Sequence, residues 1–142
     1  MQELIERILQ CQTFAVVGAS RDTQKYGYLV YRSLKESDKT VYPVNPNAQS
    51  IDEVPCFASL SLLPEKPQAV VLVVPPTVSE EAVLECARLG IDLIWMQEGA
   101  ESEEAVRRCR EAGIGVVYGG PCIMVGLRTH GMWKHTPASS PH

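Results

Sequence analysis

Apolar positions along the chain follow two patterns that alternate from one end to the other. Between residues 2 and 11 they recur every three or four positions, which predicts an amphipathic helix packed beside the core. Short runs rich in β-branched and aromatic residues predict buried strands at 13–17, 40–44, 69–74, 92–96 and 115–118. The run 69–74 is apolar throughout, as expected for a strand covered on both faces of a parallel sheet.

Helical patterns and a crossover connect these runs. A helix is predicted over 27–37, and Thr77 with Glu80 has the spacing of a capping box that opens a helix ending at Leu89. Ser102 is predicted to cap another helix, which ends at Gly113. Residues 48–68 hold three prolines, so we expect an irregular crossover there, with at most a helical turn and a short extended piece. This alternation predicts an α/β fold: a doubly wound, parallel, five-stranded sheet between two helical layers.

The length of 142 residues suits one domain. We expect that domain to cover residues 1–135, and we expect the Pro- and Ser-rich residues 136–142 to form a flexible tail. No apolar run approaches the ~18 residues needed to span a membrane, and the N-terminus is acidic where a secretory signal would be basic. The sequence therefore predicts a soluble, cytoplasmic protein.

Charge and cysteine usage narrow the function classes. A formal net charge of −4 argues against nucleic acid or an anionic membrane surface as a partner. Five cysteines lie singly along the chain, which favours reduced thiols over disulfides or a zinc site. Cys86 and Cys109 fall on apolar helix stripes and are expected in the core, which leaves Cys122 as the cysteine best placed for chemistry. His130, His135 and His142 fit no usual zinc spacing, so no metal is expected.

The segment after the first strand carries the clearest chemistry. In an open parallel sheet the ligand crevice lies beyond the carboxyl ends of the strands. Gly18 and Gly27 bound a loop there, and Gly27 at the start of a helix would let a phosphate approach free amides that carry roughly half a positive charge. Ser20 can add a hydroxyl, and Arg21 and Lys25 can add positive charge. We expect a bulky side chain at Gly27 to block the ligand and leave the fold intact.

A nicotinamide or flavin dinucleotide site is the main competing interpretation. The loop from Gly18 to Gly27 lacks the compact G-x-G-x-x-G spacing. The second strand ends in Asn45 and Pro46, where a dinucleotide site usually has an Asp or Glu for the ribose. The longer loop leaves room for a bulkier, phosphate-bearing ligand.

Six short motifs occur in order, most of them where a predicted strand ends. They are Val17-Gly18-Ala19-Ser20, Lys25-Tyr26-Gly27, Val44-Asn45-Pro46, Val74-Pro75-Pro76, Trp95-Met96-Gln97 and Cys122-Ile123-Met124. Together they resemble the CoA-binding domain family, which is similar to the N-terminal domain of the succinyl-CoA synthetase α-subunit. The resemblance runs from about Ile8 to Val125 and implies a Rossmann-like fold that holds coenzyme A, or an acyl-CoA, across the strand ends.

The resemblance also implies a set of ligand contacts. The loop residues 18–27 would hold phosphates, Asn45 and Pro46 would border the nucleotide, Pro75 and Pro76 would wall it, and Gln97 would face the pantetheine arm. The implied binding residues are Gly18, Ala19, Ser20, Arg21, Lys25, Tyr26, Gly27, Asn45, Pro46, Val74, Pro75, Pro76, Gln97 and Cys122. Gly120 and Pro121 precede Cys122 where the family often has a polar pair.

Three functions remain open at this point. The first is a module that binds coenzyme A without catalysing a reaction, which fits a phosphate loop with no catalytic constellation beside it. The second is a small NAD(P)-dependent oxidoreductase, which Asn45 disfavours. The third is a regulatory interaction domain whose nucleotide pocket has decayed, which the retained Arg21 and Lys25 disfavour. The sequence identifies no protein partner.

Overall fold

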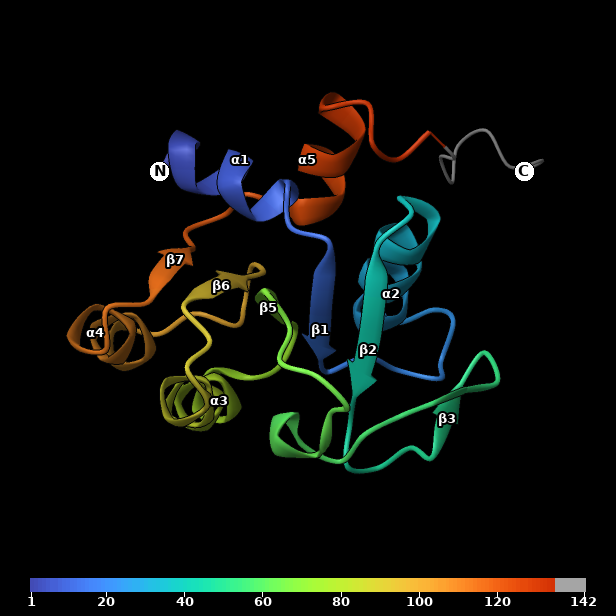
Figure 1. Ribbon diagram of the computed structural model, residues 1–142, viewed down its shortest axis with the longest axis horizontal. Coiled ribbons are helices and arrows are strands. Elements are labelled where there is room, and N and C mark those ends of the chain that lie inside the picture. The colour runs from blue at the N-terminus through green and yellow to red at the C-terminus, as the bar shows by residue number, and fades with distance from the viewer. Residues whose placement is uncertain (135–142) are drawn as a thin grey trace.

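The computed structural model describes residues 1–134 and has a five-stranded parallel sheet at its centre (Figure 1). The strands of this sheet are β1 (Thr13–Val17), β2 (Thr40–Val44), β5 (Ala69–Leu72), β6 (Leu93–Met96) and β7 (Gly115–Val117). The α-helices are α1 (Gln2–Leu9), α2 (Tyr26–Glu36), α3 (Pro76–Leu89), α4 (Glu103–Glu111) and α5 (Ile123–Thr129). The crossover between β2 and β5 holds the small hairpin β3 (Ser50–Ile51) and β4 (Val54–Pro55) and the 3-10 turn η1 (Leu60–Leu62).

The order of the strands creates a switch point beside β1. The sheet runs β2-β1-β5-β6-β7, and every neighbouring pair is parallel. The chain therefore moves from β1 outward to β2, returns across β1, and continues outward on the other side from β5 to β7. In open α/β sheets the crevice at such a reversal, beyond the carboxyl ends of the strands, is the usual ligand position. The predicted Rossmann-like α/β class is confirmed.

Helices cover both faces of the sheet, as Figure 1 shows. On one face α1, α2 and α5 pack over a core that includes Phe14, Val16 and Trp95. On the other face α3 and α4 pack over a core that includes Ala15, Ile94 and Cys86. Alternate residues of one strand point to opposite faces, which explains why β5 and β6 are apolar at every position.

The helix boundaries follow the sequence signals at some ends only. Ser102 caps α4 by accepting a hydrogen bond from the Ala105 amide at 3.0 Å, as predicted. The predicted capping box at Thr77 and Glu80 is wrong: α3 already begins at Pro76, and the Glu80 carboxylate accepts from the Ser102 hydroxyl instead. Proline suits the first position of a helix because its missing N–H would be unpaired there.

Helix α5 is the one α-helix of residues 1–134 that the apolar pattern did not predict. It has seven residues, and it packs against α1 and α2 through the buried side chains of Ile123 and Leu127.

The predicted tail 136–142, together with His135, lies outside the described residues. Among the helices of residues 1–134, none has the length and apolar character that crossing a bilayer requires.

Candidate functional site

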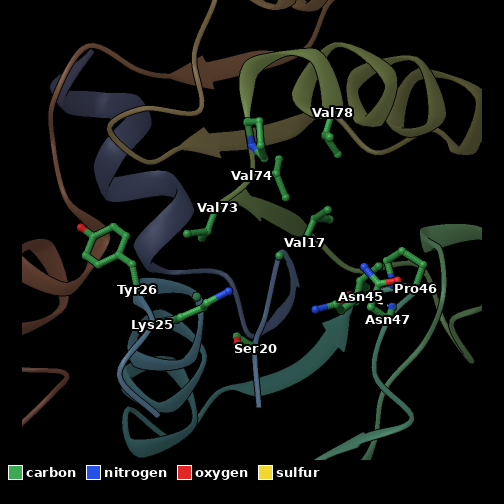
Figure 2. Close-up of a pocket in the computed structure, with 14 residues that line it drawn as sticks. Val17, Ser20, Lys25, Tyr26, Asn45, Pro46, Asn47, Val73, Val74 and Val78 are labelled. Carbon is green, nitrogen blue, oxygen red and sulfur yellow. Dashed lines mark hydrogen bonds between the residues drawn. The ribbon is translucent and has the colours of Figure 1, made fainter. Parts of the chain in front are cut away.

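A pocket of about 490 Å³ opens at the switch point, beyond the ends of β1, β2 and β5 (Figure 2). We call it the main pocket. Its lining is Val17, Gly18, Ser20, Lys25, Tyr26, Gly27, Val44, Asn45, Pro46, Asn47, Val73, Val74, Pro75 and Val78. The floor is formed by apolar strand ends, and the polar groups come from the β1–α2 loop and the residues after β2. A ligand with an apolar part and an anionic part would match this division.

Two glycines allow the β1–α2 loop to lie close to its neighbours. Gly18 has a φ of +98°, and a Cβ added there would overlap the Val73 carbonyl oxygen at the end of β5. A Cβ added at Gly27 would overlap the Gly18 carbonyl oxygen, so helix α2 starts directly against the end of β1. Both glycines therefore serve backbone packing, whatever else they do for a ligand.

The start of α2 faces the main pocket with unpaired donors. The Tyr28 and Leu29 amides donate to the Lys25 carbonyl oxygen at 3.1 and 3.2 Å, whereas the Tyr26 and Gly27 amides have no acceptor within residues 1–134. The Lys25 amino group makes no ion pair or hydrogen bond with the described residues, and Figure 2 shows it pointing into the middle of the pocket. The helix dipole and the lysine thus place positive charge on the same side of the pocket.

Side-chain hydrogen bonds order the loop before α2. The Ser20 hydroxyl oxygen accepts from the Asp22 amide at 3.0 Å, and an Asp22 carboxylate oxygen accepts from the Gln24 amide at 2.9 Å. Because Ser20 only accepts in this bond, its hydroxyl proton remains available to a ligand. The loop is therefore held in shape before any ligand binds.

Asn45 fastens the end of β2 to the end of β1. Its side-chain amide donates to the Ala19 carbonyl oxygen at 2.8 Å, and its side-chain oxygen accepts from the Asn47 amide at 2.8 Å. An aspartate could not donate the first of these bonds. The position where a dinucleotide site has its ribose carboxylate is thus used here to hold two loops together.

Two smaller hollows adjoin the main pocket. The first, the Arg21 hollow, has about 380 Å³ and is lined by Ser20, Arg21, Asp22, Asn45, Asn47 and Ala48. The second, the Pro46 hollow, has about 340 Å³ and lies between Pro46, η1 and one side of α3, where its lining includes Glu81, Glu85 and Arg88. Each shares residues with the main pocket, so a ligand longer than the main pocket has two directions in which to extend.

A second polar group lies at the other side of the site. Tyr26, which lines the main pocket and is 39% exposed, places its hydroxyl oxygen 3.0 Å from the Cys122 sulfur. Gln97, fully buried after β6, donates from Nε2 to the Tyr26 hydroxyl at 2.8 Å and lies 3.4 Å from the Cys122 sulfur. We call Tyr26, Gln97 and Cys122 the thiol cluster.

The direction of the hydrogen bonds in the thiol cluster follows from one backbone amide. Ile123 N–H donates to Gln97 Oε1 at 2.9 Å, which fixes the amide group of Gln97 with its NH₂ toward Tyr26 and Cys122. The Tyr26 oxygen accepts from that NH₂, so its own proton is free to point at the sulfur. Both neighbours can therefore donate to Cys122, and both donate when it is a thiolate, which has no proton of its own.

These donors change the acidity of the thiol. Burial, the largest single influence, raises the pKa of Cys122, but the hydrogen bonds from Tyr26 and Gln97 and from the Val125 and Met124 backbone together bring that pKa below its usual value. Burial raises the pKa of Tyr26, and the hydrogen bond to Cys122 raises it further. The sulfur therefore ionises before the phenol.

The structure brings most of the residues implied by the resemblance to one place. Gly18, Ser20, Lys25, Tyr26, Gly27, Asn45, Pro46, Val74 and Pro75 line the main pocket. Five others do not: Ala19 is buried behind the loop, Arg21 lines its own hollow, Pro76 starts α3, and Gln97 and Cys122 reach the pocket only through Tyr26.

Sequence reasoning missed five residues that line the main pocket. They are Val17, Val44, Asn47, Val73 and Val78. The three valines at or next to the ends of β1, β2 and β5 were detectable, because the last residues of each strand border the crevice in this fold. Val78 and Asn47 enter the pocket through the start of α3 and the turn after β2, which the pattern did not resolve. Within residues 1–134 no cluster of histidine, cysteine and acidic side chains has the makings of a metal site.

Comparison with known proteins agrees with this geometry. A family model described as "CoA binding domain" matches residues 12–128. The chain belongs to this family. The match covers β1 to α5, so it includes the main pocket and the thiol cluster of this CoA binding domain.

Curated relatives of this CoA binding domain are longer enzymes. Over 82 residues the chain is 37% identical to acetate–CoA ligase [ADP-forming] II of Archaeoglobus fulgidus, a match that covers 56% of this chain and 12% of the ligase. The chain spans between 11% and 17% of the length of four such relatives, each named as an ADP-forming acetate–CoA ligase or a subunit of one.

Solved structures of similar size share the fold. A conserved hypothetical protein from Pyrococcus furiosus has 38% sequence identity and a TM-score of 0.77, with 81% of this chain and 98% of that chain covered. A hypothetical protein from Pyrococcus horikoshii has 30% identity and a TM-score of 0.85, with 91% of each chain covered. This CoA binding domain is therefore related to a domain of the ADP-forming synthetases and to small proteins of the same length.

Proposed function

We propose that this protein binds coenzyme A, or an acyl-CoA, in the main pocket and its adjoining hollows, and that it performs no catalytic step of its own. The observation that carries the proposal is the start of α2, where two free amides and the unpaired Lys25 face one pocket at the switch point of the sheet. We further propose that the protein works in the cytoplasm, where all five cysteines would stay reduced.

The pyrophosphate of the ligand is assigned to the start of α2. Its negative charge would meet the Tyr26 and Gly27 amides, the Ser20 hydroxyl and the Lys25 amino group. These groups come from one ordered loop, so little conformational entropy would be lost when the ligand binds.

The two hollows suit two parts of the nucleotide of coenzyme A, the adenine base and the 3′-phosphate. The Pro46 hollow offers apolar side chains for a planar base and carboxylates in its lining that can accept from an exocyclic amino group. The Arg21 hollow offers a guanidinium that has no partner among residues 1–134, which suits the 3′-phosphate that distinguishes coenzyme A from NAD. Asn45 lines both the main pocket and the Arg21 hollow.

The absence of catalysis is proposed from the pocket lining. Among the described residues, the main pocket is lined by no histidine, cysteine or carboxylate, so the Ser20 hydroxyl has no general base of these kinds beside it in the pocket. Ligase activity belongs to the longer relatives, and we do not extend it to this chain.

Isothermal titration calorimetry with coenzyme A, acetyl-CoA, dephospho-CoA and NAD tests the proposal. Coenzyme A is expected to bind more tightly than NAD; equal or tighter NAD binding would contradict the proposed ligand. Arg21→Ala is expected to weaken coenzyme A binding by about 1–3 kcal/mol and to leave dephospho-CoA binding nearly unchanged. Arg7→Ala, which removes the same charge near the amino ends of the strands, is the matched control.

A further inference from the structure

Cys122 differs from the other cysteines of the chain in its surroundings. Cys86 and Cys109 are fully buried in the core under α3 and α4, and burial raises the pKa of each thiol. Cys11 packs beside β1 in the opposite core and Cys56 lies against it, and burial raises their pKa values as well. Cys122 belongs to neither core, is only half-buried, and has two hydrogen-bond donors at its sulfur.

The thiol cluster lies on the same edge of the sheet as the main pocket. The strand order places the pocket over the ends of β2, β1 and β5, and the next two strands along that edge lead to Gln97 and to the loop before Cys122. Trp95 holds this loop through a hydrogen bond from its indole nitrogen to the Pro121 carbonyl oxygen at 3.0 Å. Tyr26 spans the two regions, because it lines the pocket and its hydroxyl contacts the sulfur.

We propose that Cys122 is the site of a reversible mixed disulfide with the thiol end of a ligand whose nucleotide occupies the main pocket. The inference rests on the proposed function, since coenzyme A ends in a thiol on a long flexible arm. An arm that starts at the α2 end of the pocket and follows the strand ends passes Tyr26 and reaches Cys122.

The chemistry is a thiol–disulfide exchange with the symmetrical disulfide of coenzyme A. Cys122 gives its proton to solvent, and the thiolate attacks one sulfur of the disulfide. A bond forms between Cys122 Sγ and that sulfur, the bond between the two coenzyme A sulfurs breaks, and the leaving thiolate takes the electron pair and a solvent proton. Cys122 is thereby oxidised and half of the disulfide is reduced to coenzyme A. Tyr26 and Gln97 act as positioning residues that hold the thiolate.

Intact-protein mass spectrometry after incubation with coenzyme A disulfide tests this assignment. The reduced wild-type chain is expected to gain the mass of one coenzyme A less two hydrogens, one from each thiol, and dithiothreitol is expected to remove the adduct. Peptide mapping should place the adduct at Cys122. Cys122→Ser should abolish the adduct, whereas Cys56→Ser, which removes the other half-buried cysteine, should retain it.

Two further measurements separate directed exchange from general thiol reactivity. Glutathione disulfide, which has no nucleotide, is expected to react about tenfold or more slowly than coenzyme A disulfide, because binding raises the local concentration of the tethered sulfur. Equal rates with the two disulfides, or an adduct that persists in Cys122→Ser, would overturn the inference. If calorimetry shows coenzyme A binding and no adduct forms, this inference alone fails. If coenzyme A does not bind, the proposed function fails with it.

Discussion

The two edges of the sheet use similar polar side chains in opposite ways. At the amino ends of the strands, Lys39 donates to the carbonyl oxygens of Leu9 and Cys11, both at 2.7 Å. At the carboxyl ends, the Lys25 amino group has no hydrogen-bond or ion-pair partner among residues 1–134, and the first two amides of α2 stay unpaired there. One edge has satisfied its donors internally, and the other presents them to a pocket.

This difference separates stability from function along each strand. Donors that are paired within the chain add to the free energy of unfolding. Donors that have no partner within the chain and face a pocket add little to stability and remain available to a ligand. The same distinction applies to the amides that precede the strands: Gln68 Oε1 accepts from the Gln12 amide at 2.6 Å and from the Thr13 amide at 3.2 Å. Substitutions at one edge should therefore change stability, and substitutions at the other should change binding.

The largest expected effect is an exception to this rule, at Gly27. Gly27→Ala places a methyl group against the Gly18 carbonyl oxygen, and backbone overlap cannot be relieved by a side-chain rotation. We expect the free energy of unfolding to fall by about 3 kcal/mol or more, measured by urea denaturation. Gly119→Ala, where the added methyl meets no neighbour and only the φ of +90° is strained, is expected to cost about 1 kcal/mol. Equal losses in the two variants would contradict the packing role of Gly27.

A pair of lysine substitutions tests the comparison of the two edges directly. Lys39→Met leaves two carbonyl oxygens without their donor, so we expect a loss of about 1–3 kcal/mol in stability and unchanged coenzyme A affinity. Lys25→Met removes a charge that faces the pocket, so we expect unchanged stability and a loss of about 1–3 kcal/mol in binding. Urea denaturation gives the free energy of unfolding of each variant, and calorimetry gives its affinity for coenzyme A. Loss of binding in Lys39→Met, or loss of stability in Lys25→Met, would show that the edges are not separate.

The order of strands and helices was predictable because each strand carries a continuous apolar run and each long helix a periodic one. Helix α5 was not predictable in this way, since only Ile123 and Leu127 of its seven residues are fully buried and Gly126 interrupts it. The spacing of Gly18 and Gly27 located a loop that lines the main pocket, and the assignment of phosphates to this loop stays a prediction. The structural reason for a glycine at position 27 was not predictable, because the group that a side chain would overlap is the Gly18 carbonyl, nine residues away. The expectation that a bulky residue at position 27 leaves the fold intact conflicts with that overlap.

The thiol cluster shows the same limit of sequence reasoning. Gln97 was expected to face the pantetheine arm, but it is fully buried and its side chain joins β6 to the start of α5. Contacts of this kind link residues 25 and 71 positions apart, and no local pattern reports them. The role of Gln97 toward a ligand therefore stays a prediction.

The smallest expected effect concerns the acidity of one thiol at each edge of the sheet. Iodoacetamide reacts with the thiolate, so the rate of alkylation rises with pH through the pKa of each cysteine. The pKa of Cys122 lies below its usual value and burial raises that of Cys11, so Cys122 should reach half of its maximal rate at the lower pH. Peptide mapping after timed alkylation measures both profiles.

Tyr26→Phe measures how much the phenol contributes to the low pKa of Cys122. Removing a hydrogen-bond donor destabilises the thiolate, so the Cys122 profile should move to higher pH and alkylation at neutral pH should slow several-fold. Gln97 keeps its bond to Ile123 and still faces the sulfur, and the Val125 and Met124 backbone is unchanged, so only part of the effect should be lost. Tyr28→Phe removes a hydroxyl from the same helix that bonds to Asp52 instead, and it should leave the Cys122 profile where it is. A Cys122 profile that does not move in Tyr26→Phe would mean that the phenol does not hold the thiolate.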